Sequence, residues 1–557
     1  MLIPQGRPGT EPSGPLPSST GEPGWQLWLK RHAEWLAPLV VSGLAMGVWL
    51  HQLGEVPFRD WDEGYYTVVA REMLERGDWL HPHYLDQPFL VKPPLLFWLT
   101  ALGFQLGGFT ESAGRWPGAF VSALAVPLTY AIARQVFQRR DTAVIAAIAL
   151  ITMLPAARLG RLVMMDGPST TFLLVMLLGA LLGRDRPPWR LLIGLGLGAA
   201  LLCKGSLGLL FLLMVVAFSA FDRGLASLRC PWLGLGIVLG LAPVLWWFGL
   251  QVSQYGTAYL TVSFEQQISK RVASGIEGHS QPFWYYGPEL LKGLFPWLLL
   301  AGLGVRQAWC QGQGRSCRLL LVPSGLYLLA ISITQTKLPW YILPLLPFVA
   351  MAAALPLARA WRGSALPRPR VWIALWALLA LGGLAAVFSL QRLPGQAGLL
   401  PAVSLVTLGF ALSALFAQLA RPRALVVSLL ACQVLAMLAL FRSYHWLWEL
   451  AESFQVRPVA ALLKRHVPAH ATVLIAYPGG RPSLDWYCHC SVLPATPALL
   501  ADVKAKAAGQ PLLLLDEPNR RTWFPHAPVL GQAQGFSLVS PQPPGPEPLP
   551  RTQAQKN

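Results

Sequence analysis

Apolar runs of membrane-spanning length recur from residue 36 to residue 442 and restrict the chain to a membrane fold. A helix needs about 20 apolar residues to cross a bilayer. Hydrophobic residues make up 54% of the 557 residues and charged residues 13%, so there is more apolar surface than one soluble core can bury. We expect a polytopic α-helical membrane protein with thirteen transmembrane helices, near 36–53, 115–137, 141–157, 169–183, 190–203, 206–221, 231–250, 293–308, 318–334, 341–358, 371–391, 398–419 and 424–442.

The basic residues fix the expected orientation. The net charge is +18, but the Lys and Arg side chains lie in short loops between apolar runs, as in membrane proteins that keep basic loops in the cytoplasm. This placement argues against nucleic acid as a partner. If the apolar stretch from Leu95 to Phe109 lies along the membrane as a juxtamembrane helix, the basic loops share one face: Lys30-Arg31, Arg139-Arg140, Arg184/Arg186/Arg190, Arg223/Arg229, Arg315/Arg318, Arg359/Arg362/Arg368/Arg370 and Arg421/Arg423.

Composition divides the chain into four parts. Residues 1–30 are rich in Pro, Gly, Ser and Thr and are expected to form a disordered cytoplasmic tail. Residues 31–442 form the membrane domain, with a first outer loop at 54–114. After thirteen crossings, residues 443–540 lie outside the cytoplasm, and their mixed helical and strand patterns predict a small soluble α/β domain. The Pro-rich segment 541–557 is expected to be disordered.

Unusual charges gather on the non-cytoplasmic face in this topology. The first outer loop carries the adjacent acids Asp62 and Glu63, beside a membrane where charge is costly. Four further polar segments share this face: Arg158 to Gly167, the Lys204 junction, Gln251 to Lys292, and Thr334 to Trp340. Their convergence indicates a functional surface rather than a set of tethers.

The seven cysteines are scattered and show no paired C-x-x-C zinc pattern. Cys488-His489-Cys490 lacks a second ligand cluster, so an ordinary strand with two thiols is favoured over a metal site.

Several short motifs follow one another in a specific order and spacing. They are Asp62-Glu63, Arg71-Glu72-Met73, Gly77-Asp78-Trp79, Lys92-Pro93-Pro94-Leu95-Leu96-Phe97-Trp98, Arg115-Trp116-Pro117-Gly118, Met165-Asp166, Lys204-Gly205, Pro282-Phe283-Trp284-Tyr285-Tyr286 and Lys337-Leu338-Pro339-Trp340-Tyr341-Ile342-Leu343-Pro344. Together they resemble the integral-membrane glycosyltransferases of the GT-C superfamily, specifically the group with the lipid A aminoarabinose transferases and the protein O-mannosyltransferases. The resemblance covers most of residues 36–345.

The resemblance implies transfer of a sugar from a polyprenyl-phosphate carrier to an acceptor, with inversion at the anomeric carbon. The acceptor must be oriented, or deprotonated if it is a hydroxyl, by a carboxylate. The leaving phosphate must be met by fixed cations. By their match to the family, Asp62 and Asp166 are expected to be catalytic, with Glu63 as a support of Asp62. The candidates for the cations that bind the donor phosphate are Lys92, Lys204, Arg271 and Lys337. Tyr65 and Tyr341 are expected to contact substrate.

Each of these residues also has a structural interpretation. The three acids suit helix N-termini. The lysines suit the membrane interface, where long side chains reach the headgroups. Three positions depart from the family pattern and leave the acceptor open: Tyr65 stands where aminoarabinose transferases often place a basic residue, Val91 where many members carry Glu, and Glu265-Gln266-Gln267 where His is expected.

A lipid or glycolipid acceptor resembling lipid A is the first expectation, and a protein Ser/Thr acceptor the second. A lipid or sugar transporter remains an alternative of another class, although its charges should lie near the midplane in two related halves. A non-catalytic scaffold is a further one. No cofactor is indicated, and a divalent metal stays open. We expect an integral protein of the plasma (inner) membrane with its site on the extracytoplasmic side.

Overall fold

The computed structural model describes residues 24–60, 62–263, 265, 280–447, 455–476, 481–506 and 511–541. The expected tail at 1–30 falls outside these ranges up to residue 23, and helix α1 (Gly24–Trp49) includes its last seven positions. The expected tail at 541–557 lies outside them from residue 542 onward.

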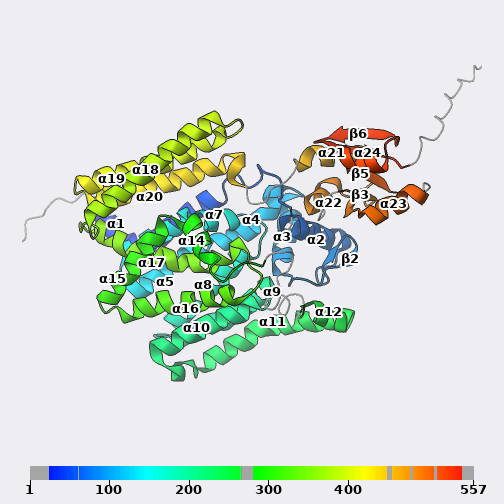
Figure 1. Ribbon diagram of the computed structural model, residues 1–557. Coiled ribbons are helices and arrows are strands. Elements are labelled where there is room, and N and C mark those ends of the chain that lie inside the picture. Colours follow the sequence, from blue (N-terminus) through cyan, green and yellow to red (C-terminus); the bar gives the residue numbers. More distant parts are fainter. Residues whose placement is uncertain are drawn as a thin grey trace, which may run out of the picture.

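A helical bundle forms the larger part of the molecule (Figure 1). Its core is built around α17 (Leu346–Trp361), in which nearly every side chain is buried. The other bundle helices are α4 (Glu111–Ala123), α5 (Ala125–Phe137), α6 (Arg140–Thr152), α7 (Leu154–Leu159), α8 (Asp166–Leu182), α9 (Leu191–Lys204), α10 (Leu207–Arg223), α11 (Pro231–Tyr255), α12 (Thr257–Thr261), α14 (Tyr286–Leu294), α15 (Trp297–Cys310), α16 (Gly314–Ile333), α18 (Pro369–Arg392), α19 (Leu400–Gln418) and α20 (Pro422–Phe441), with short 3-10 turns η1 (Pro187–Arg190), η2 (Leu225–Leu228), η5 (Pro339–Leu345), η6 (Ala397–Leu399) and η7 (Tyr444–Trp446).

Seven helices in the described part of the chain are long and apolar enough to cross a membrane, or eight if the bent pair α14 and α15 is one span. One of the seven is the continuous stretch Glu111–Phe137, which joins α4 and α5. Shorter helices such as α6, α8, α9 and α10 occupy other expected spans. The chain is therefore a multi-pass helical membrane protein, and the count of thirteen crossings stays a prediction.

Helix α9 carries Lys204 at its last position and is held very close to α11. Glycines four residues apart meet across the two helices, because a Cβ on Gly194 would lie 1.9 Å from the Gly236 carbonyl carbon. Gly198 faces Gly240 in the same way, with its Cβ position 2.1 Å from the Gly240 oxygen. Small residues that let backbones touch are the usual basis of helix packing in membranes, so these glycines fix the depth of Lys204.

The first outer loop folds into α2 (Asp62–Arg76), a short hairpin of β1 (His83–Tyr84) and β2 (Gln87–Pro88), and α3 (Leu95–Gly107). Helix α3 covers the stretch expected to lie along the membrane, and its 13 residues are too few to cross a bilayer. Its place at the membrane stays a prediction. In Figure 1, α2 and α3 lie between the helical bundle and the C-terminal sheet.

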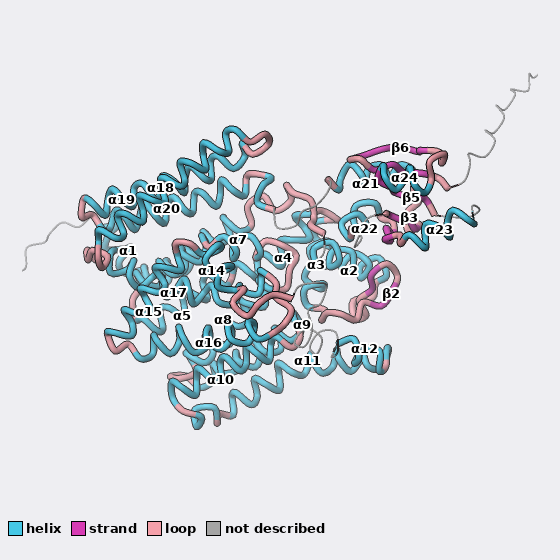
Figure 2. The backbone as a smooth tube through the Cα atoms, viewed as in Figure 1, coloured by secondary structure: helices cyan, strands magenta, loops and turns pink. Residues whose placement is uncertain are grey.

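The C-terminal region has the expected α/β character, as Figure 2 shows. One sheet has the strand order β4-β3-β5-β7-β6, in which β3 pairs in parallel with β4 and β5, and β7 pairs antiparallel with β5 and β6. Its elements are α21 (Val456–His466), β3 (Thr472–Ile475), α22 (Pro482–Cys488), β4 (Ser491–Pro494), α23 (Pro497–Lys506), β5 (Leu512–Asp516), α24 (Glu517–Trp523), β6 (Val529–Ala533) and β7 (Phe536–Val539).

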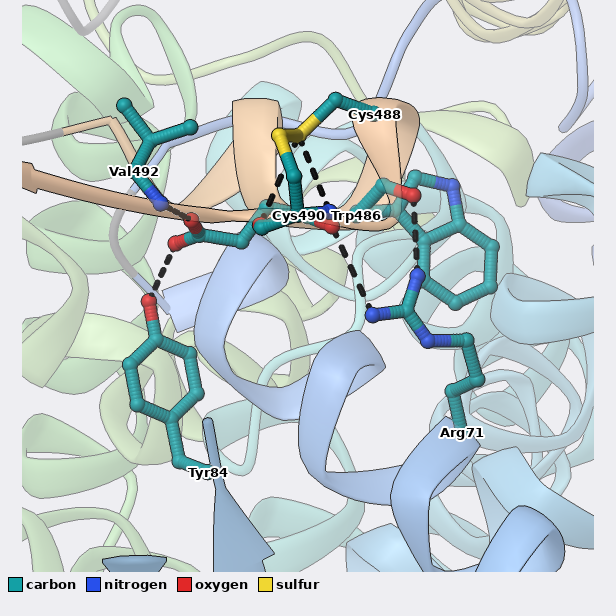
Figure 3. The surroundings of a disulfide bond; sticks show 7 residues. Arg71, Tyr84, Trp486, Cys488, Cys490 and Val492 are labelled. Carbon is teal, nitrogen blue, oxygen red and sulfur yellow. Dashed lines mark hydrogen bonds between the residues drawn. A yellow bond between two sulfur atoms is a disulfide. The ribbon is translucent and has the colours of Figure 1, made fainter. Parts of the chain in front are cut away.

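The expected strand with two thiols at Cys488-His489-Cys490 is wrong. Cys488 ends α22, His489 takes a left-handed conformation with φ 56°, and β4 begins only at Ser491. Cys488 and Cys490 form a disulfide across this turn (Figure 3). The turn could not be recognised from the sequence because only two residues separate the end of the helix from the start of the strand.

Candidate active site

A buried ion pair between Lys204 and Asp166 forms the centre of the candidate site. Asp166 is the first residue of α8 and Lys204 the last residue of α9, so the packing of these two helices brings the charges together. The Asp166 side chain is 6% exposed and the Lys204 side chain is 15% exposed. The ring of Tyr341, from η5, lies 5.1 Å from the Lys204 ammonium group. A lysine has three N–H donors, so this pair leaves Lys204 able to bind a further acceptor.

Asp62 and Lys92 border this pair. Both act electrostatically on the Asp166 carboxyl, Asp62 as a like charge and Lys92 as an opposite one. The turns also touch, because Pro93 Cγ lies 3.7 Å from where a Cβ on Gly205 would stand. Gly205 has a φ of 64°, a conformation that favours glycine and lets the chain reverse directly after Lys204. Two carboxylates and two lysines, each named from the sequence, therefore converge from three separate segments.

Glu63 fixes the start of α2 and hence the position of Asp62. Its carboxylate is 1% exposed and accepts two hydrogen bonds of 2.8 Å from the guanidinium of Arg115, which is itself fully buried. It also accepts from the backbone N–H groups of Arg59, at 2.9 Å, and Val163, at 3.0 Å. Burial raises the pKa of Glu63, but Arg115 and these donors outweigh it and hold the pKa below its usual range. Glu63 thus has every feature of a positioning residue.

Asp60, two positions before Asp62, binds to residues of the C-terminal region. Arg481 pairs with its carboxylate, and Ser483 donates to it from the hydroxyl and, at 3.1 Å, from the backbone N–H. Pro482 lies so close to Gly64 that a Cβ on that glycine would be 2.8 Å from it. The loop carrying Asp62 is therefore held on one side by Arg115 and on the other by α22.

Further contacts fasten α22 to the first outer loop, and Figure 3 shows the contact of Arg71 with Trp486. Arg71 donates to the backbone carbonyl of Trp486 at 3.0 Å, and the Tyr84 hydroxyl donates to Asp485 at 2.6 Å. The Trp486 ring stacks on Phe104 with centroids 4.8 Å apart. The C-terminal region is thus part of the wall behind the site rather than a tethered appendage.

Asp485 gives this contact a pH dependence. Burial raises its pKa from 3.8 to about 7, although Tyr84, the Val492 N–H and Arg71 favour the charged form. Between pH 3.8 and about pH 7, Asp485 is therefore protonated in the folded protein and ionised in the unfolded chain. The contribution of Asp485 to stability falls as the pH rises through this interval. We expect the difference in melting temperature between wild type and Asp485→Asn to be more positive at pH 5 than at pH 8, by a few degrees.

Thermal unfolding of the purified full-length protein at both pH values measures this effect. Asp502→Asn is the matched control, because Asp502 lies in the same region, is half exposed and pairs with Lys506. A difference for Asp485→Asn that is the same at pH 5 and pH 8 would contradict the expected titration.

Of the other predicted residues, Lys337 and Tyr65 have contacts of their own. Lys337 is 3% exposed, donates to the Thr334 carbonyl at 2.5 Å, and has a pKa lowered by burial. It stands just before η5, the element that supplies Tyr341. Tyr65 packs on Tyr84, with ring centroids 4.8 Å apart. Arg271 lies outside the described residues. The roles of these residues remain predictions.

The residues that hold the site in position were not predicted from the sequence. Arg115 stood in a family motif without a role, and Asp60 and Arg481 carried no local signal. Arg161 is also fully buried and lies over Phe441 at 3.8 Å, with donors aimed at the carbonyls that end α1. Among the residues that the structure describes, no three His, Cys, Asp or Glu side chains are grouped to hold a metal ion.

Comparison with known proteins agrees with the motifs. Residues 91–247 match the family model described as dolichyl-phosphate-mannose-protein mannosyltransferase. Curated relatives include the undecaprenyl phosphate-alpha-4-amino-4-deoxy-L-arabinose arabinosyl transferase of Pectobacterium carotovorum, 32% identical over 58% of this chain and 59% of the relative. The enzyme of that name from Aeromonas salmonicida is 29% identical over 64% of this chain and 66% of its own length. The chain thus spans about 59% of the length of the first of these relatives.

The fold is shared with solved structures. The crystal structure of ArnT from Cupriavidus metallidurans in the apo state superposes with a TM-score of 0.74 over 92% of this chain and 100% of that chain, at 19% identity. The structure of the same protein bound to undecaprenyl phosphate superposes with a TM-score of 0.73. In sequence the chain is thus similar to the aminoarabinose transferases and, over residues 91–247, to the mannosyltransferase family, and it shares the fold of the ArnT structures.

Proposed function

We propose that the protein transfers a sugar from a polyprenyl-phosphate carrier to a lipid or glycolipid acceptor that resembles lipid A. The observation that carries the proposal is the Lys204–Asp166 pair, with Tyr341 over the ammonium group and with Lys92 and Asp62 beside it. Lysines at a membrane boundary suit a phosphate on a lipid carrier, and a half-buried carboxylate next to them suits an acceptor. The names of the relatives support the same donor class.

In the proposed reaction, the bond between the anomeric carbon and the carrier phosphate breaks, and its electron pair leaves with the polyprenyl phosphate. Lys204 and Lys92 offset the charge that develops on that phosphate. The acceptor oxygen forms the new bond from the opposite side of the sugar, which inverts the anomeric centre. Asp62 takes the proton of an acceptor hydroxyl, whereas an acceptor phosphate is already ionised and needs only orientation.

We place the site on the extracytoplasmic side of the plasma (inner) membrane. Asp166 and Lys204 share one end of the bundle, while Arg184, Arg190 and Arg223 stand at the opposite ends of α8, α9 and α10. Retention of basic loops in the cytoplasm supports this orientation.

The test is a reconstituted transfer assay on the full-length protein. Polyprenyl-phosphate-linked pentoses and hexoses, including 4-amino-4-deoxy-L-arabinose, are offered with a lipid A extract or with a Ser/Thr peptide, and products are identified by mass spectrometry. Lys204→Met with Asp166→Asn removes both charges, so that no buried charge is left unpaired. We expect kcat/KM to fall about 100- to 1,000-fold in this double variant.

Lys292→Met is the matched control, because Lys292 is 74% exposed. Turnover by the double variant equal to that of the control would exclude Lys204 from donor binding. Formation of a glycosylated peptide without a glycosylated lipid would show that the acceptor is a Ser or Thr side chain of a protein substrate. No product from folded wild type with any donor would overturn the proposal.

A further inference from the structure

A second cluster of charge lies at the other end of the bundle from the candidate active site. Helix α8 runs from Asp166 to Leu182, and 17 residues of helix extend about 26 Å. The cluster therefore lies close to the opposite membrane face. It gathers Arg184 after α8, Asp222 and Arg223 at the end of α10, and Arg315 and Arg318 at the start of α16.

One carboxylate serves several arginines in this cluster. The Asp222 side chain is 4% exposed and lies 2.8 Å from Arg184 Nη2, 3.1 Å from Arg318 Nη2 and 4.0 Å from Arg315 Nε. Arg223 adds a further guanidinium, which donates to the Arg184 carbonyl at 3.3 Å. Asp185 also acts on Arg184, but two acids cannot neutralise four guanidinium groups, so the cluster keeps a positive excess that favours an anion.

Some buried donors in the cluster lack acceptors within the described protein. The Arg184 side chain is 10% exposed, yet its Nε and Nη1 atoms make no hydrogen bond, and neither does Nε of Arg318. Buried polar groups are nearly always satisfied, and an unsatisfied charged donor is costly. An acceptor from outside the chain would remove that cost.

A small pocket opens beside Arg184. Its polar lining comes from Arg184, Arg190, Asp222, Arg223 and Ser227, and its apolar lining from residues such as Phe218. Guanidinium groups bind phosphate in a bidentate manner and are preferred for this anion. The guanidinium groups of the pocket therefore suit the oxygens of a phosphate group that lies at its opening.

The surroundings of the pocket point to a lipid as the source of the phosphate. Trp189, Phe221 and Leu225 lie next to it in sequence and are 44%, 68% and 69% exposed. Aromatic side chains in such positions are typical of the membrane interface, where acyl chains and headgroups meet. Basic pockets between transmembrane helices on the cytoplasmic side are a known way to hold anionic headgroups.

We propose that this arginine pocket binds the phosphate of an anionic phospholipid headgroup in the leaflet opposite the candidate active site. General attraction of basic loops to an anionic surface needs only exposed charge. The pocket differs because Arg184 is buried, is held in place by Asp222, and keeps two donors unused. The proposal does not depend on the sugar or the acceptor of the transfer reaction.

Native mass spectrometry of the full-length protein, released from nanodiscs of phosphatidylcholine with a minority of phosphatidylglycerol, tests the proposal. We expect wild type to retain phosphatidylglycerol about tenfold above its share in the membrane, and Arg184→Gln with Arg223→Gln to lose this enrichment. Arg186→Gln with Arg229→Gln is the matched control, because it removes the same charge from the same two connections at exposed positions outside the pocket lining.

Enrichment that survives in the Arg184/Arg223 variant, or that falls equally in the control, would overturn the proposal in favour of general electrostatics. A further arm uses inorganic phosphate with nanodiscs of phosphatidylcholine alone. Thermal stabilisation by phosphate without enrichment of phosphatidylglycerol would assign the pocket to a free anion and overturn the lipid. Arg223→Gln alone leaves the Arg184–Asp222 pair intact and serves if the double variant does not fold; it should still reduce the enrichment.

Discussion

Replacing Asp62 by asparagine is expected to lower kcat by about 100- to 10,000-fold if the acceptor is a hydroxyl, because a positioned general base contributes that much. Asp62 is half-buried at the first position of α2 and acts on the charge of Asp166. Its neighbours Asp60 and Glu63 hold the backbone, so the variant should fold normally. Single-turnover transfer with the purified variant measures the loss.

Asp86→Asn is the control for this variant. Asp86 belongs to the same outer loop, its side chain is 72% exposed, and it pairs with Arg76 away from the four central charges. A loss in Asp62→Asn no larger than in this control would remove Asp62 from the reaction. An intermediate loss, in kcat/KM more than in kcat, would indicate an acceptor that is already ionised and that Asp62 only orients.

Replacing Glu63 by glutamine is expected to lower the free energy of unfolding by about 3 to 5 kcal/mol, because it leaves the fully buried Arg115 guanidinium without its counter-charge. The loss should exceed that of any surface ion pair in the same helix. Thermal or denaturant unfolding in detergent, followed by tryptophan fluorescence, measures it.

Glu75→Gln is the matched control in α2, since its carboxylate is 34% exposed and lies 3.6 Å from Arg71. The double variant Glu63→Gln with Arg115→Met removes both buried charges and should recover part of the lost stability, as a coupled pair requires. If Glu63→Gln were no less stable than Glu75→Gln, the ion pair between Glu63 and Arg115 would not stabilise the outer loop by the amount given above.

The sequence was sufficient for the architecture where patterns are long. The apolar runs predicted a multi-pass helical protein, and the mixed helical and strand patterns of residues 443–540 predicted the α/β character of the C-terminal region. Helix α22 and strand β4 were not predicted, because seven residues are too few to show a helical period and the chain reverses at His489 directly before the strand. Paired helices such as α14 and α15 were also missed, since the bend of 104° between them depends on tertiary packing.

The central charges of the site could be named in advance because a lysine or an acid at a membrane boundary is conspicuous. Lys204 interrupts an apolar hairpin, and Asp166 opens the helix after a polar segment. The supports could not be named in the same way. Arg481 and Asp60 are ordinary charges in ordinary loops, and only the folded chain shows that each has the other as its partner.

The contacts of Arg481 and Ser483 with the loop of Asp62 can form only late in the synthesis of the chain. Ser483 contacts Asp60 across 423 residues of sequence, so the N-terminal half of the contact is made long before its partner exists. Until the last hundred or so residues are synthesised and folded, the outer loop has no Arg481 or Ser483 to hold it. A nascent or truncated chain would therefore carry all four central charges without the contacts of Arg481 and Ser483 that hold the loop of Asp62.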